Sequence, residues 1–301
     1  MKLLIINNLV SGFREGSIYD FIRAFAADGD EVCIRSTDGR KEIGGLLHDA
    51  HTFDLVVASG GDGTVASVSY ALRNTNIPIL PFPAGTANLV ALNLSLPLEH
   101  HSLSKLARNG DTLDFDIGEL EIGGSTFGFA LIAGAGYDAT IMQYAEPAKR
   151  ILGPIAYFGA AVTHAIAQKS HFTLSLDGKT IESEGLGVLV LNFSKIQFDI
   201  SVAHDSSPRD GAFEVVVLKA STAFELIPDL IAGLLDRGGD YPNRSDALEI
   251  HRANNVEVVA DPPMEVQYDG EATKLTTPFK ARILEKACRF IVSEEALALY
   301  Q

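Results

Sequence analysis

The chain has 301 residues, of which 47% are hydrophobic and 21% charged, a composition typical of a folded protein with a large core. Asp and Glu total 39 against 24 for Lys and Arg, so the net charge is −15. This charge repels a phosphate backbone and argues against nucleic acid as a partner. The two cysteines are far apart and form no CxxC pair, which argues against a disulfide framework or a zinc site and indicates a reducing, cytoplasmic setting. No window of about 18 residues is continuously apolar and free of breakers, so no transmembrane segment is expected.

The first third of the chain alternates short apolar runs with helical patterns. This rhythm predicts a doubly wound α/β domain with a parallel sheet, whose ligands bind beyond the carboxyl ends of the strands. We expect strands at 3–7, 32–36, 55–58 and 77–81, and helices at 18–27 and 65–72.

From about residue 113 the pattern changes to short β-type runs separated by turn signals such as Asp177-Gly178, which predicts a mostly antiparallel β domain. The two domains should therefore cover residues 1–113 and 114–284, and residues 285–301 could pack back on the first. We expect strands at 172–176, 187–193 and 213–218, and helices at 151–168 and 223–235.

A glycine-rich loop, Gly60-Gly61-Asp62-Gly63-Thr64, follows the third strand and opens a helix. Glycines let backbone N–H groups approach an anion, and a helix N-terminus adds partial positive charge. The loop is neither of the two common nucleotide-binding fingerprints, so a tight turn with Thr64 as the helix N-cap is the structural alternative. Asp62 would bind Mg²⁺ or orient the loop, unless it only bonds to its own backbone in a turn.

A second glycine-containing loop, Pro83 to Asn88, follows the next strand and also precedes a helix. Carboxyl ends of parallel strands meet at one edge of a sheet, so the two loops should lie side by side there. Two such loops at this spacing indicate a phosphate site far more strongly than either loop alone.

With these loops the sequence resembles the diacylglycerol kinase catalytic-domain family, which includes bacterial soluble lipid kinases and sphingosine and ceramide kinases. The family's signatures are N-P-x-S-G, G-G-D-G-T, P-x-G-T-x-N and a late D-G-E. The chain has these signatures as Asn8-Leu9-Val10-Ser11-Gly12, Gly60 to Thr64, Pro83 to Asn88 and Asp269-Gly270-Glu271. Fainter similarities to the family lie at 129–139, 152–157 and 209–211.

The resemblance implies an α/β domain similar to NAD kinase and 6-phosphofructokinase, followed by a β-sandwich, with the active site in the cleft between them. It implies transfer of the γ-phosphate of ATP to a lipid hydroxyl with Mg²⁺, with Glu271 as general base and Asp62 as a second catalytic residue. A metal site would use Ser207, Asp210 and Ala212, the first and last through backbone oxygens. The nucleotide would be held by Asn8, Thr37, Gly60, Gly61, Asp62, Gly63, Thr64, Val65, Ala66, Gly85, Thr86 and Asn88.

Three departures from the family pattern keep other functions open. Leu9 replaces the proline of the first signature, Ala66-Ser67 replaces an Asn-Glu pair, and Leu89 replaces an acidic residue. One alternative is an NAD kinase-like enzyme, although the Asn-Glu pair of NAD kinases is missing near the second loop. The other is a nucleotide- or lipid-binding sensor with little or no kinase activity. Asp210 and Glu271 also each follow ordinary turn sequences, so both have a purely structural interpretation.

The most apolar parts of the second domain are residues 128–136 and the uncharged segment 151–168. Lys149, Arg150 and Lys169 bracket that segment, as expected of a helix near lipid headgroups, but its pattern is apolar all round and favours a buried crossover helix. We therefore expect a lipid substrate, met in a micelle or at a membrane surface that the protein visits peripherally. The motifs do not distinguish one lipid from another, and a homodimer is compatible with the sequence.

Overall fold

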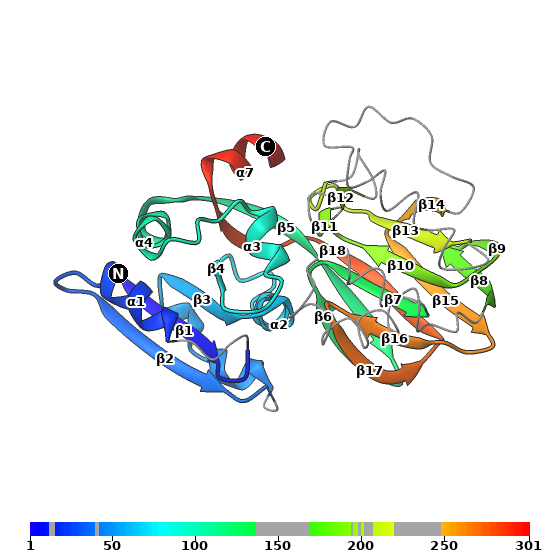
Figure 1. Cartoon of the computed structure of the whole chain (residues 1–301), viewed down its shortest axis with the longest axis horizontal. Coiled ribbons are helices and arrows are strands. Elements are labelled where there is room, and N and C mark those ends of the chain that lie inside the picture. The colour runs from blue at the N-terminus through cyan, green and yellow to red at the C-terminus, as the bar shows by residue number, and fades with distance from the viewer. Residues whose placement is uncertain are drawn as a thin grey trace, which may run out of the picture.

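The structure is a computed structural model that describes residues 1–11, 16–39, 42–136, 169–193, 195–197, 200–201, 207–219 and 248–301. It has an α/β part and a β-sandwich part (Figure 1). The helices predicted at 151–168 and 223–235 lie outside the described residues, as does the similarity noted at 152–157.

Four parallel strands form the sheet of the α/β part in the order β2-β1-β3-β4. Their pairing aligns Asn8 with Thr37 and Gly60 with Pro83, so the carboxyl ends of the strands meet at one edge. Every residue of β3 is buried, as expected of a central parallel strand covered on both faces. Each of the four strands overlaps its predicted range. Their bounds are Lys2–Asn8 for β1, Glu31–Thr37 for β2, Leu55–Gly60 for β3 and Pro78–Pro83 for β4.

Helices follow these strands and cover the sheet. α1 buries Ile18, Phe21 and Phe25, which recur at helical spacing on one face. It packs beside α4, and α2 packs beside α3. The helix predicted from residue 65 begins earlier, at Asp62, with Gly61 in the N-cap position. The bounds are Ser17–Phe25 for α1, Asp62–Ala71 for α2, Leu89–Asn93 for α3 and His100–Asn109 for α4, with short 3-10 helices at Ile43–Leu47 and Ala50–Thr52.

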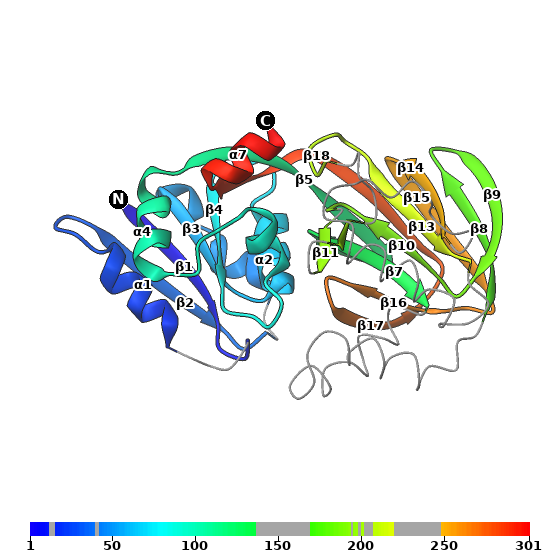
Figure 2. The same ribbon diagram turned by 45° about the horizontal axis from the view of Figure 1, so that its top comes forward.

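Two long strands, β5 (Asp111–Ile122) and β18 (Phe279–Val292), pair with each other and run from one part of the molecule to the other (Figure 2). Arg289 and Phe290 of β18 also pair with β4, so the parallel sheet continues into the second part. The hydrophobic core formed by buried residues of β1, β3 and β4, called the first core, also includes Cys288 and Ala296. The end of β18 and helix α7 (Glu294–Tyr300) therefore belong to the core of the α/β part.

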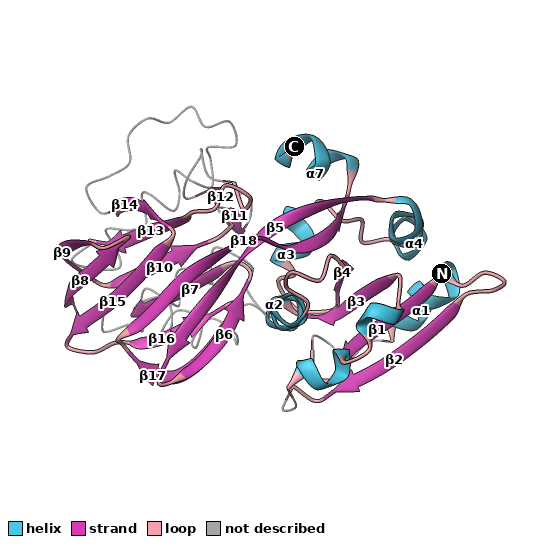
Figure 3. Ribbon diagram, turned by 180° about the vertical axis from the view of Figure 1, so that it is seen from behind, coloured by secondary structure: helices cyan, strands magenta, loops and turns pink. Residues whose placement is uncertain are grey.

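The second part is a sandwich of two mainly antiparallel layers. One layer has the order β14-β13-β10-β7-β16-β17, and the other consists of β6, β5, β18, β15, β8 and β9. Phe129, Phe172 and Phe213 come from both layers and share one core. The described helices all lie at the other end of the molecule (Figure 3). An α/β domain followed by an antiparallel β-sandwich is the fold that the sequence predicts.

The remaining strands complete these layers, except β11 and β12, which pair with each other in a separate two-stranded sheet. The segment 213–218 matches its predicted strand residue for residue. The bounds are Ser125–Phe129 for β6, Ile132–Gly136 for β7, Ser170–Leu176 for β8, Lys179–Gly185 for β9, Gly187–Leu191 for β10, Lys195–Gln197 for β11, Ile200–Ser201 for β12, Phe213–Leu218 for β13, Leu248–Ala253 for β14, Asn255–Asp261 for β15, Glu265–Tyr268 for β16 and Glu271–Thr276 for β17.

Candidate active site

The first glycine loop connects β3 directly to α2. The carbonyl oxygen of Gly61 accepts hydrogen bonds from the N–H groups of Thr64 and Val65, at 2.9 and 3.1 Å, which starts the helix. A Cβ on Gly60 would overlap the Thr64 side chain, so this sharp turn requires glycine there. The start of a helix that follows such a glycine turn is suited to an anion, because the helix dipole places partial positive charge there.

Side chains of the loop after β1 hold this turn in place. Asn8 Nδ2 donates to Thr64 Oγ1 at 2.9 Å, and the N–H of Gly61 donates to Ser11 Oγ at 2.9 Å. Thr64 is therefore not the N-cap of the helix, since its hydroxyl is held by Asn8 two residues after the helix has begun. Thr37, also predicted here, is buried at the end of β2, where its hydroxyl accepts from the N–H of Gly39 at 3.1 Å.

The second glycine loop lies against the first, as the sequence predicts. A Cβ on Gly85 would overlap the Cα atom of Gly61. The loop is closed by Asn88, a left-handed residue at φ +53°, whose Oδ1 accepts from Gly85 N at 2.7 Å. Asp62 Oδ1 accepts from the N–H of Val90 at 2.9 Å. The two loops are thus joined directly by one carboxylate and form one continuous surface.

The residues predicted to bind the nucleotide differ in how far their side chains are exposed to solvent. Thr86 is exposed at the tip of the second loop. Val65 and Ala66 are 3% and 0% exposed and belong to the first core. Their side chains face the interior of the α/β part, so contact with a nucleotide would use their backbone alone. Burial also explains why alanine is accommodated at 66 although the family pattern is polar there.

Glu271, the predicted base, reaches the first loop from the sandwich. It begins β17, directly after the turn at Asp269 and Gly270. A Cβ built on Gly63 would lie 3.3 Å from Glu271 Cγ and 3.4 Å from its Oε1. The structure therefore brings a carboxylate of the second part to the first turn of the helix that opens from the phosphate loop.

Asp269 is a site residue that the sequence analysis did not single out, although the D-G-E signature contains it. Its carboxylate accepts from the N–H groups of Ala130, Leu131 and Ile132 at 2.6, 2.8 and 2.9 Å. Burial, helped by the nearby charge of Asp62, raises the pKa of Asp269 to about 7, although these three donors lower it. Asp269 thus fastens the turn that carries Glu271 to the segment between β6 and β7.

The predicted metal residues lie on another turn, which leads into β13. The N–H groups of Ser207 and Ala212 both donate to the carboxylate of Asp210 at 3.1 Å, and Ser207 O accepts from Asp210 N at 3.2 Å. Arg252 Nη2 donates to Asp210 Oδ2 at 2.6 Å. This arrangement does not fit a divalent cation, because the Asp210 carboxylate already accepts hydrogen bonds from the Arg252 guanidinium and from two backbone N–H groups.

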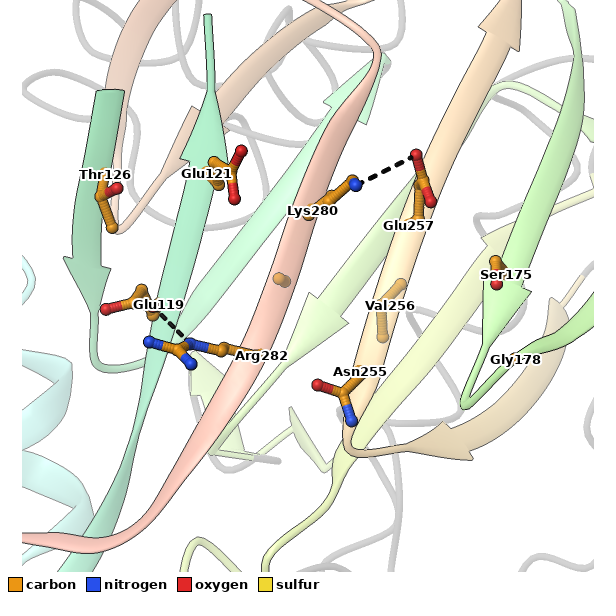
Figure 4. A pocket seen from close by; sticks show the side chains of 11 residues that line it. Glu119, Glu121, Thr126, Ser175, Gly178, Asn255, Val256, Glu257, Lys280 and Arg282 are labelled. Atoms are coloured by element: carbon orange, nitrogen blue, oxygen red, sulfur yellow. Dashed lines mark hydrogen bonds and ion pairs between the residues drawn. The ribbon is translucent and has the colours of Figure 1, made fainter. Parts of the chain in front are cut away.

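A hollow of about 520 Å³ lies on the sheet of the sandwich that contains β5, β18 and β15 (Figure 4). Its walls carry two ion pairs, Lys280 with Glu257 and Arg282 with Glu119. None of its lining residues belongs to the glycine loops. Residues 132–136 of the apolar stretch 128–136 form β7, which pairs with β10 and β16 in the middle of the other layer.

No helix among the described residues is both long and apolar enough to cross a membrane. The described residues also contain no group of three or more His, Cys, Asp or Glu side chains arranged to hold a metal ion.

The fold and the site define a class of protein: a two-part protein whose paired glycine loops are suited to an anion and receive a carboxylate from the second part. Residues 2–120 match the model of the diacylglycerol kinase catalytic domain. Residues 132–292 match that of the YegS C-terminal NAD kinase beta sandwich-like domain.

Relatives with known names agree with these matches. A diacylglycerol kinase of Bacillus subtilis is 32% identical over 73% of this chain and 71% of its own length. An uncharacterised protein of Synechocystis is 26% identical over 87% of this chain, which spans only 61% of that protein. A crystal structure of a diacylglycerol kinase from Bacillus anthracis superimposes with a TM-score of 0.70 at 19% identity, covering 98% of each chain. The chain belongs to the diacylglycerol kinase catalytic-domain family and is a kinase of that family.

Proposed function

We propose that this kinase transfers the γ-phosphate of ATP to the hydroxyl of a diacylglycerol-like lipid, with Glu271 as the general base. The observation that carries the proposal is the contact of Glu271 with Gly63, which places a carboxylate beside the first turn of the phosphate-loop helix. A base must come within hydrogen-bond reach of the proton that it removes, and only this glycine's lack of a side chain lets the carboxylate approach so closely.

The residues of the two loops would orient the nucleotide. Backbone N–H groups at the start of α2 would bind phosphate oxygens. Asn88 closes the second loop, and Asp62 ties the first loop to the helix that follows the second. Such fixed donors stabilise charge that develops on the transferred group. When bound, Mg²⁺ would neutralise charge on the phosphates, and Asp62 offers the carboxylate that Mg²⁺ takes in addition to phosphate oxygens.

The lipid acceptor is inferred from the relatives, since a diacylglycerol kinase covers most of this chain at 32% identity. A lipid hydroxyl is a weak nucleophile until its proton is removed, which gives a carboxylate at this point a chemical task. We propose that the lipid is met in a micelle or at a membrane surface.

The experiment measures transfer of label from γ-³²P-ATP to lipids in mixed micelles with Mg²⁺, using a panel of lipid alcohols and NAD. Glu271→Gln should lower kcat about 10²- to 10⁴-fold, because the base is lost while the size of the side chain is kept. Its affinity for ATP should be unchanged. Glu265→Gln is the matched control, since Glu265 is an exposed carboxylate on the adjacent strand β16.

Other outcomes separate the alternatives. Label in NAD and in no lipid would assign an NAD kinase. Binding of ATP with no transfer to any acceptor would assign a sensor. A Glu271→Gln variant as active as Glu265→Gln would remove Glu271 from the chemistry.

A further inference from the structure

Helix α2 contacts the sandwich at both of its ends. Near its start, Gly63 lies against Glu271 of β17, and near its end Tyr70 lies against β5 and β6. Seven residues separate Gly63 from Tyr70, which is about two helical turns and about 10 Å, so both lie on one face of the helix. Figure 1 shows α2 at the border between the two parts, beside β6.

Tyr70 is bonded to the sandwich through its hydroxyl group. The hydroxyl donates to Glu119 of β5, and the same carboxylate accepts from Arg282 of β18. Burial and the hydrogen bond to Glu119 together raise the pKa of Tyr70 to about 12. Tyr70 therefore stays a neutral donor at physiological pH. The guanidinium of Arg73 lies 4.1 Å from the centre of the Tyr70 ring and fixes the ring from the solvent side.

Gly128 of β6 allows the helix to come this close. A Cβ on Gly128 would overlap the Cβ of Tyr70, an atom next to the backbone that cannot move without moving the helix. Gly128 lies two residues before Ala130, whose N–H donates to Asp269. A short, contiguous path of contacts thus leads from Tyr70 through Gly128 and residues 130–132 to Asp269, two residues from Glu271.

We propose that Tyr70 is a positioning residue for phosphate transfer. By joining the last turn of the phosphate-loop helix to β5 and β6, it sets how closely Glu271 approaches the loop at the other end of the same helix. Tyr70 itself touches neither reactant. The proposal rests on the proposed function of Glu271.

The test compares kcat and the KM for ATP in Tyr70→Phe, Tyr70→Ala and Gly128→Ala. Tyr19→Phe is the control, since Tyr19 is 52% exposed on α1. Displacing a reacting group by about 1 Å costs up to about a hundredfold in rate. We expect Tyr70→Ala and Gly128→Ala to lower kcat at least tenfold with little change in KM for ATP. Tyr70→Phe keeps the packing of the ring against Gly128 and loses the hydroxyl bond to Glu119, so its kcat should lie between those of the wild type and Tyr70→Ala.

A second measurement does not depend on activity. Amide hydrogen exchange of residues 130–132 and 269–271 should be faster in Tyr70→Ala than in Tyr19→Phe, because the path from Gly128 to Asp269 is loosened. Unchanged exchange there would overturn the proposal.

The kinetic results distinguish the two hypotheses. If Glu271→Gln abolishes transfer while folded Tyr70→Ala keeps the wild-type kcat, the positioning role is wrong and the proposed function stands. If Glu271→Gln is fully active, the proposed function fails and the positioning role fails with it. A rise in KM for ATP at unchanged kcat would also overturn the positioning role.

Discussion

Two of the Asp-Gly turns in the sandwich, those at Asp269 and Asp210, look alike in sequence and differ in their surroundings. At Asp269 the carboxylate is held by three backbone N–H groups, and the turn presents Glu271 to the phosphate loop. At Asp210 two N–H groups and the guanidinium of Arg252 surround the carboxylate. The first turn thus presents the carboxylate of Glu271 to the glycine loop, whereas the carboxylate of Asp210 in the second turn is paired with a cation. The two turns differ in the partners that the fold brings to them.

The largest expected difference between the turns is catalytic. Asp269→Asn replaces one carboxylate oxygen with an amide group that cannot accept from Ala130 or its neighbours. Because this loosens the turn that carries Glu271, we expect phosphate transfer to slow by about a hundredfold. Asp210→Asn should leave the rate unchanged. The check is kcat at saturating ATP for both variants, and equal rates would show that the two turns are equivalent.

A smaller difference should appear in the pH dependence of stability. The pKa of Asp269 is raised to about 7 by burial, from about 4 in an unfolded chain. The folded protein therefore holds this proton more tightly, and the resulting stabilisation is present below pH about 4 and is lost as the pH rises through about 7.

Thermal unfolding of the wild type and of Asp269→Asn at a series of pH values measures this effect. The wild type should lose stability relative to the variant as the pH rises toward neutral, and the difference should be constant above that. A difference that does not vary with pH would mean that folding leaves the pKa of Asp269 unchanged, because the three N–H donors offset the effect of burial.

The smallest effect concerns the other turn. Arg252 and Asp210 are 49% and 26% exposed, so their ion pair is worth no more than about 1 kcal/mol. Arg252→Gln should lower the Tm slightly more than the control Arg23→Gln, which removes an exposed pair on α1, because Arg252 Nε also lies 3.3 Å from Oε1 of the buried Glu214. Because Arg252 takes the place of a cation, the wild-type Tm should be the same in EDTA and in millimolar Mg²⁺. A rise with Mg²⁺ and without nucleotide would restore the metal prediction.

The sequence predicts local features well because they depend on neighbouring residues. The strands of the parallel sheet, the loops after β3 and β4 and the closeness of those loops follow from apolar spacing and glycines. The contacts of Asp269 and Asp210 join residues 137–139 and 42 positions apart. No local pattern encodes such contacts. The same holds for the Thr64 hydroxyl, which the sequence offers as a helix cap and which instead accepts from Asn8, far earlier in the chain.

If Gly63 and Glu271 act together across the two parts of the molecule, the effects of substituting them should not be additive. A double-mutant cycle on kcat at saturating ATP measures this, using Gly63→Ala, Glu271→Gln and the double variant. A methyl group at 63 would lie 3.3 Å from Glu271 Cγ and push the carboxylate away. We predict that Gly63→Ala slows transfer in the wild-type background and has no further effect once Glu271 is glutamine. Equal, independent effects in both backgrounds would contradict the account.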